Sequence, residues 1–115
     1  MNQIDRDIEI IKKMLSYCDE ISETVATLGN SIDSFSGNTI YKNACAMCIM
    51  QIGELSSRLS DGFREKHDDI PWQAIRGMRN VIAHAYININ ELDMWETIQN
   101  DVPTLKAYCT SLLES

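Results

Sequence analysis

The fold prediction starts from residues 39–59, TIYKNACAMCIMQIGELSSRL. Its first half is apolar on nearly every side of a helical wheel, which is typical of a central, buried helix. Its second half is one-sided, with Ile52, Leu55 and Leu59 facing the core and Glu54 nearer water. We therefore expect one long helix in the middle of a helical bundle.

A second long helix precedes this stretch. From residue 4 to residue 28 the apolar side chains recur mostly at steps of three and four, which indicates one face of a helix. Gly-Asn at 29–30 is a good helix stop. The polar residues 31–38 are expected to form a loop, and residues 61–69 a connection to the next helix.

The C-terminal part also favours helices. Pro71 suits the first turn of a third helix that reaches to about Tyr86, because a proline lacks only an N–H that the first turn leaves unpaired. The alternation at 87–90 could suggest a short strand, but four residues without a partner strand are weak evidence. A fourth helix is expected after Asn90, a suitable N-cap, and Pro103 should kink or split it.

These elements predict an all-α, antiparallel bundle of four to five helices in one domain, 1–115. The chain has 115 residues, of which 44% are apolar, enough for one compact core and too few for two. No apolar run approaches 18 residues, and the start lacks the apolar segment of a secretory signal. We therefore expect a cytoplasmic protein without a membrane span.

Charge and cysteines narrow the classes of function. With 17 acidic and 10 basic residues the net charge is −7, so a nucleic acid would need a local basic site. Cys45 and Cys48 have the C-x-x-C spacing of a metal knuckle or a redox pair. No second such pair follows, and the segment looks helical and apolar. Buried, reduced thiols are the favoured interpretation, with zinc or redox chemistry as the alternative.

The basic site is expected within residues 70–90. This stretch contains no acidic residue, although the chain as a whole is acidic. On a helical wheel its polar arc carries Arg76, Arg79, Asn80, His84 and Tyr86. A solvated helix face usually mixes Glu and Lys instead. The arc therefore resembles an anion site.

The side chains of this arc suit cleavage of an RNA phosphodiester without a metal. Arg79 could stabilise charge on the phosphoryl oxygens, with Arg76 and Asn80 as supporting groups. His84 could move a proton to or from the reacting oxygens, of which the 2′-OH is absent from DNA. Arg79 and His84 point about 140° apart on one helix. A two-fold dimer would bring both groups to a shared site.

Structural interpretations of the same residues stay open. Arg76 and Arg79 could pair with acidic side chains of other helices. His84 could be a partly buried, hydrogen-bonded residue, and Tyr86 could be a packing residue with its hydroxyl in water.

Residues 79–86 read R-N-x-x-x-H-x-Y, which resembles the signature of the HEPN superfamily and specifically the HepT toxins, formerly DUF86. The likeness covers nearly the whole chain. It includes the segments DRDIEII, QIGELSSRLS, REKHDDIPWQAIRGMRNVIAHAY and WETIQNDVPTLK. Ala85 stands where many relatives have Gly, a change that a helix should tolerate.

The resemblance implies a helical bundle that dimerises through its motif helix. It implies a metal-independent ribonuclease toxin without a cofactor, in which Arg79 and His84 are the catalytic pair. It also implies a type VII-like toxin–antitoxin pair, whose minimal nucleotidyltransferase antitoxin silences the toxin by transferring AMP to Tyr86. Added bulk and negative charge there would block RNA.

Three hypotheses follow from these observations. The first is the ribonuclease toxin, acting on tRNA or mRNA. The second is a non-catalytic binding module that docks a minimal nucleotidyltransferase and a nucleotide. The third is a structural bundle whose polar arc forms an ion-paired dimer interface. Substitution of His84 separates the first two, because it should abolish cleavage and leave docking intact.

Overall fold

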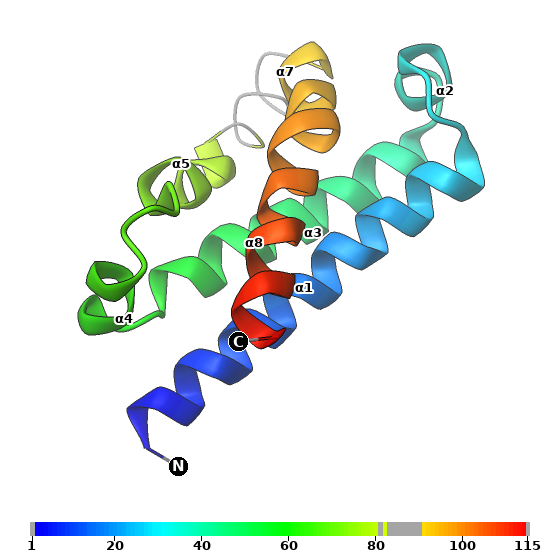
Figure 1. Cartoon of the computed structure of the whole chain (residues 1–115). Coiled ribbons are helices and arrows are strands. Elements are labelled where there is room, and N and C mark those ends of the chain that lie inside the picture. Colours follow the sequence, from blue (N-terminus) through cyan, green and yellow to red (C-terminus); the bar gives the residue numbers. More distant parts are fainter. Residues whose placement is uncertain (1, 81, 83–90, 115) are drawn as a thin grey trace.

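The protein is a bundle of helices built around two long ones (Figure 1). A computed structural model describes residues 2–80, 82 and 91–114. The helices α1 (Gln3–Leu28) and α3 (Thr39–Ser57) run antiparallel side by side, and α8 (Val102–Glu114) packs against α1. The described part of the chain contains no strand. The predicted all-α class is therefore confirmed, whereas dimerisation stays a prediction.

The core lies where α1, α3 and α8 meet. Burial of apolar surface here is the main force that holds the three helices together. The fully or almost fully buried side chains of these helices include Ile11, Met14, Cys18, Ile21, Cys45, Ile49, Ile52, Val102, Leu105 and Cys109. Because all four cysteines, Cys48 included, belong to this core, their sulfur atoms act as small apolar groups in the packing.

Both ends of α1 are capped. The side chain of Asn2 accepts a hydrogen bond from the backbone N–H of Asp5 at 2.9 Å and caps the first turn. Gly29 ends the helix with φ 112°, a conformation that residues with a Cβ rarely adopt. The predicted stop at 29–30 is therefore confirmed.

The predicted loop at 31–38 is wrong, because this segment contains a short helix, α2 (Ile32–Ser36). Ser31 caps it by accepting a hydrogen bond from the N–H of Ser34 at 3.1 Å. Phe35 is fully buried, with its ring 5.1 Å from the ring of Tyr41 and 5.2 Å from that of Trp95. Burial of the Phe35 ring among other aromatic rings stabilises the protein, and the helix is the conformation that places the ring there.

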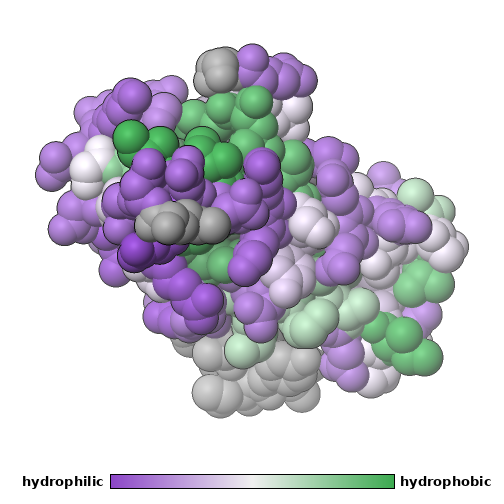
Figure 2. Space-filling model, turned by 90° about the horizontal axis from the view of Figure 1, so that it is seen from below, coloured by the Kyte–Doolittle hydropathy of each residue, from purple (hydrophilic) through white to green (hydrophobic). Residues whose placement is uncertain are grey.

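The surface of α3 corrects a second expectation. Its first half was predicted to be buried all round, but Ile40, Met47 and Met50 are 77%, 52% and 47% exposed. The later half follows the prediction, with Leu55 buried and Glu54 partly exposed. Figure 2 shows one face of the molecule, where hydrophilic residues dominate and apolar residues gather in patches between them. Within the described ranges, no helix has the length and hydrophobicity of a membrane span.

The predicted connection at 61–69 also contains a short helix, α4 (Asp61–Lys66). Ser60 caps it, accepting a hydrogen bond from the N–H of Phe63 at 3.1 Å. The buried carboxylate of Asp7 accepts hydrogen bonds from the N–H and the hydroxyl of Ser60, at 3.0 and 2.7 Å. This contact between α1 and the start of α4 explains why the segment is ordered as a helix.

The third predicted helix begins as expected and is then interrupted. Pro71 precedes α5 (Trp72–Arg76), which ends at Gly77. The N–H of Gly77 donates to the backbone oxygen of Gln73 at 3.0 Å, and residues 78–80 and 82 are helical again. The prediction of one unbroken helix from Pro71 is therefore wrong at Gly77. Its extension to Tyr86 lies outside the described residues.

The fourth predicted helix starts and splits as expected. It consists of α7 (Glu91–Glu96), a π-helical turn η1 (Thr97–Asp101) and α8. The irregular turn ends at Asp101, two residues before Pro103, which lacks an N–H and would crowd the carbonyl one turn earlier in a regular helix. The predicted split at Pro103 is confirmed. The possible strand at 87–90 lies outside the described residues.

Candidate phosphate-binding site

The polar arc predicted around Arg79 exists in the part that the structure describes. Arg76, Arg79 and Asn80 are exposed. The apolar residues interleaved with them, Ile75 and Met78, are 4% and 3% exposed and belong to the core. The helical spacing therefore sorts the side chains as predicted, even though Gly77 interrupts the helix between Arg76 and Arg79.

His84 and Tyr86 cannot be placed in this arrangement, because residues 83–90 lie outside the described residues. The predicted catalytic role of His84 and the predicted modification of Tyr86 therefore rest on the sequence. The predicted angle between Arg79 and His84 likewise stays a prediction.

Arg79 is held by an ion pair with α3. Its Nη1 donates a hydrogen bond to the Oε1 of Glu54, across 25 residues of sequence. The two side chains keep 48% and 43% of their surface exposed. For Arg79 the alternative of pairing with an acidic side chain of another helix is thus confirmed. For Arg76, no salt bridge with another described residue occurs.

The stem of Arg79 passes directly over Gly53 on α3. A Cβ at Gly53 would lie 2.5 Å from Cγ and 3.3 Å from Cδ of Arg79, so any larger residue would displace the stem. It would also lie 3.6 Å from the backbone oxygen of Arg76. A glycine inside a helix costs roughly 0.5–1 kcal/mol relative to alanine, and here the close approach of a neighbouring element requires it.

Sequence reasoning missed the roles of Gly53 and Glu54. Both belong to the segment QIGELSSRLS, and Glu54 was assigned only to the water-facing side of its helix. One signal was available, because a glycine in the middle of a helical pattern often marks a close packing contact. Nothing in the local sequence names Arg79 as the partner, since the contact joins two separate elements.

The two cysteines of the C-x-x-C pair are buried, as the favoured interpretation predicts. Burial raises the pKa of the Cys45 thiol to about 11. Burial, and after it the hydrogen bond from Sγ to Glu20, raise the pKa of Cys48 to about 12. Such thiols are poor nucleophiles at neutral pH. In the described part of the chain, no three His, Cys, Asp or Glu side chains are grouped as metal ligands.

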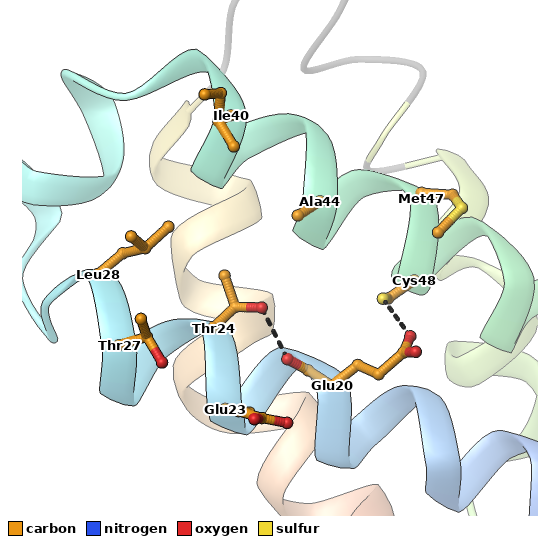
Figure 3. Close-up of a pocket in the computed structure, with 9 residues that line it drawn as sticks. All are labelled: Glu20, Glu23, Thr24, Thr27, Leu28, Ile40, Ala44, Met47 and Cys48. Carbon is orange, nitrogen blue, oxygen red and sulfur yellow. Dashed lines mark hydrogen bonds between the residues drawn. The ribbon is translucent and has the colours of Figure 1, made fainter.

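A concave region lies between α1 and the first half of α3, away from Arg79 (Figure 3). This groove has a volume of about 430 Å³. Its lining residues are Glu20, Glu23, Thr24, Thr27, Leu28, Ile40, Ala44, Met47 and Cys48. Among these lining residues two are acidic and none is basic, so the groove would repel a phosphate. The arginine-bearing face remains the candidate site.

Comparison with known proteins assigns the chain to a family. A model of HepT-like ribonucleases matches residues 5–112. The chain belongs to the HepT-like ribonuclease family. The resemblance that the R-N-x-x-x-H-x-Y segment carries is therefore confirmed.

Curated relatives of this HepT-like chain are known from bacteria and archaea. A protein of Caldanaerobacter subterraneus subsp. tengcongensis, provisionally named an RNase, is 32% identical over 90% of this chain and 91% of its own length. One from Methanocaldococcus jannaschii with the same kind of name is 31% identical over 88% and 86%. A protein of Thermococcus cleftensis, provisionally named ribonuclease HepT, is 36% identical over 48% and 50%. No solved structure matches the chain.

Proposed function

We propose that this HepT-like protein is an endoribonuclease that cleaves RNA phosphodiesters without a metal, with Arg79 and His84 as its catalytic pair. The observation that carries the proposal is the exposed guanidinium of Arg79, held on α3 by Glu54 in a chain of a ribonuclease family. An arginine offers a planar set of donors that fits a phosphate. Arg76 and Asn80 are exposed on the same stretch and supply further contacts.

The chemistry assigns one proton carrier to each side of the phosphate. The imidazole of one His84 takes the proton of the 2′-OH, and the 2′-oxygen attacks the phosphorus to form a 2′,3′-cyclic phosphate. The departing 5′-oxygen receives a proton from a second imidazole. Arg79 stabilises the charge that grows on the phosphoryl oxygens. Because the chain holds a single His84, a two-fold homodimer supplies the second imidazole.

The proposed regulation acts at Tyr86. A minimal nucleotidyltransferase transfers AMP from ATP to the Tyr86 hydroxyl and releases pyrophosphate, and the attached phosphate adds negative charge to the polar arc. RNA is then excluded by repulsion and by occupancy. In this role the protein is the toxin of a toxin–antitoxin pair, and its unmodified form is the active one.

The test uses purified, unmodified protein and total cellular RNA in EDTA. We expect cleavage that leaves 2′,3′-cyclic phosphate ends, and its loss in the His84→Ala and Arg79→Ala variants. Arg58→Ala is the matched control. Arg58 is exposed at the end of α3, and its substitution removes the same charge at a different place. Intact mass confirms that Tyr86 carries no AMP.

The opposite result favours the non-catalytic module. If unmodified protein leaves RNA intact and still binds the nucleotidyltransferase, Arg79 and His84 hold a phosphate without cleaving it. Cleavage that persists in both His84→Ala and Arg79→Ala would overturn the assignment of the catalytic pair.

A further inference from the structure

The contact between Arg79 and α3 is more specific than a surface ion pair. Exposed ion pairs between flexible side chains usually hold neither partner in one place. Here the stem of Arg79 occupies a slot that exists only because residue 53 has no side chain. Gly53 itself is buried, and Glu54 follows it directly. Two successive residues of α3 therefore define the path of the stem and the position of its charged end.

The pair with Glu54 leaves the guanidinium able to bind a phosphate. A guanidinium has five N–H donors, and the contact with Glu54 uses Nη1. About half of the Arg79 side chain stays exposed to solvent. A carboxylate that takes one edge of the guanidinium can thus orient the remaining edge toward a ligand.

We propose that Gly53 and Glu54 are positioning residues that set where the Arg79 guanidinium meets an RNA phosphate. This inference rests on the proposed function of Arg79. A free arginine samples many rotamers, and fixing one of them costs entropy when the substrate binds. The slot and the ion pair fix the rotamer of Arg79 when the protein folds. The guanidinium is therefore already in place when the transition state forms.

Glu54 could instead mask Arg79, and this role predicts the opposite change in the rate of cleavage. If the carboxylate masks Arg79, its removal should free the guanidinium and speed cleavage. If the carboxylate positions Arg79, its removal should slow cleavage. The direction of the change in kcat therefore decides between the two.

The first measurement compares Glu54→Gln with Glu65→Gln. Both variants remove one carboxylate, and Glu65 lies exposed on α4. With total cellular RNA as the substrate, we expect Glu54→Gln to lower the apparent kcat roughly 10- to 100-fold, with a smaller change in KM. Glu65→Gln should match the wild type. An unchanged or raised kcat in Glu54→Gln overturns the inference.

A double-mutant cycle shows whether Glu54 acts through Arg79. In an Arg79→Lys background the side chain has lost the planar fork that Glu54 orients. We expect the effect of Glu54→Gln on kcat to shrink in that background. Equal fold-changes in both backgrounds would mean that Glu54 acts independently of Arg79, which contradicts the inference.

The slot is tested by Gly53→Ala against Gly62→Ala. A Cβ at Gly62 meets nothing within 4 Å, whereas one at Gly53 collides with the Arg79 stem. Alanine favours helix in both places, so both variants should fold. We expect cleavage to fall in Gly53→Ala alone. Wild-type cleavage by a folded Gly53→Ala protein would overturn the role of the slot.

An NMR measurement keeps this inference separate from the proposed function. The Nε–H resonance of Arg79 reports the surroundings of its guanidinium without any RNA. We expect it to shift in Glu54→Gln and to stay in place in Glu65→Gln. If the wild type cleaves no RNA but the resonance shifts, the proposed function fails and the positioning of Arg79 stands. If the resonance does not shift, the inference fails whatever the cleavage result.

Discussion

The two ends of α3 present opposite surfaces. Near its start, the exposed side chains of Ile40 and Met47 line a groove together with Glu20, and the described lining of this groove carries no basic side chain. Near its end, Gly53 and Glu54 hold an arginine at the surface. The comparison teaches that one helix can offer apolar surface at one end and a held, exposed arginine, the proposed phosphate ligand, at the other. Helix α1 runs beside both ends of α3, and the difference comes from the Arg79 segment, which packs on the second end.

The largest expected effect concerns the buried face that both ends share. Ile49 is fully buried between them, whereas Met47 on the same helix is 52% exposed. Ile49→Ala should lower the free energy of unfolding by about 2–5 kcal/mol, because it leaves a cavity. Met47→Ala should change it by less than about 0.5 kcal/mol. Urea unfolding followed by circular dichroism measures both, and similar losses would contradict the one-sided burial of α3.

The next effect contrasts the two ends in catalysis. Arg79→Ala should lower kcat for RNA cleavage about 100- to 1,000-fold, the usual loss when a donor to a developing oxyanion is removed. Met47→Gln at the groove should leave cleavage unchanged. The rate at which cyclic phosphate ends form from total RNA gives both values. Comparable losses in the two variants would mean that the groove also takes part in cleavage.

A smaller effect concerns the thiol in the groove. Glu20 accepts a hydrogen bond from Cys48 at 3.3 Å, and this bond and its negative charge help to raise the pKa of the thiol. Glu20→Gln should lower that pKa and speed alkylation by iodoacetamide at pH 9. Burial is the larger cause and persists, so the rate should stay below that of the unfolded chain. Glu23→Gln serves as the control. Equal alkylation rates in the two variants would show that Glu20 does not raise the pKa of Cys48.

The Cys48 thiol also makes the stability of the folded protein depend on pH. Its pKa of about 12 in the folded protein lies above its ordinary value of 9.0. Its contribution to stability is therefore fully present below pH 9 and is lost as the pH rises toward 12. In Cys48→Ala the Tm should fall less steeply between pH 9 and 11 than in the wild type. Parallel Tm curves would show that this thiol titrates alike in both states.

The smallest effect concerns Arg76, the last residue of α5. It is exposed, and Gly77 separates it from the helical residues that carry Arg79. Arg76→Ala should weaken RNA binding uniformly across sequences. It should also reduce the slope of log affinity against log salt by about 1, the value for one lost phosphate contact. Fluorescence anisotropy with a labelled RNA at several salt concentrations measures this slope. An unchanged slope would place Arg76 outside the RNA-binding face.

Local signals predicted the long elements well. The apolar periodicity and the Gly-Asn stop located α1, and Pro103 located the irregular turn before α8. The same reasoning failed at 31–38 because the helix there depends on Phe35, whose ring packs on Tyr41 and on the distant Trp95. It failed at Gly77 because the spacing of apolar residues continues across the interruption.

For the site, periodicity identified Arg76, Arg79 and Asn80 as exposed, and the motif identified the family. Periodicity assigns a side chain to a face of its own helix. It carries no information about which residue of another element lies opposite that face. The partnership of Arg79 with Glu54, and the slot at Gly53, therefore required the tertiary structure.

The sequence by itself determined the helical class, the polar arc around Arg79 and the membership of the HepT-like ribonuclease family. The tertiary structure alone decided that Arg79 meets α3 at a glycine and a carboxylate. The physical reason is that helix formation and amphipathic burial depend on neighbours within a turn or two. The contact that holds Arg79 joins residues 25 positions apart and forms only when two helical segments pack.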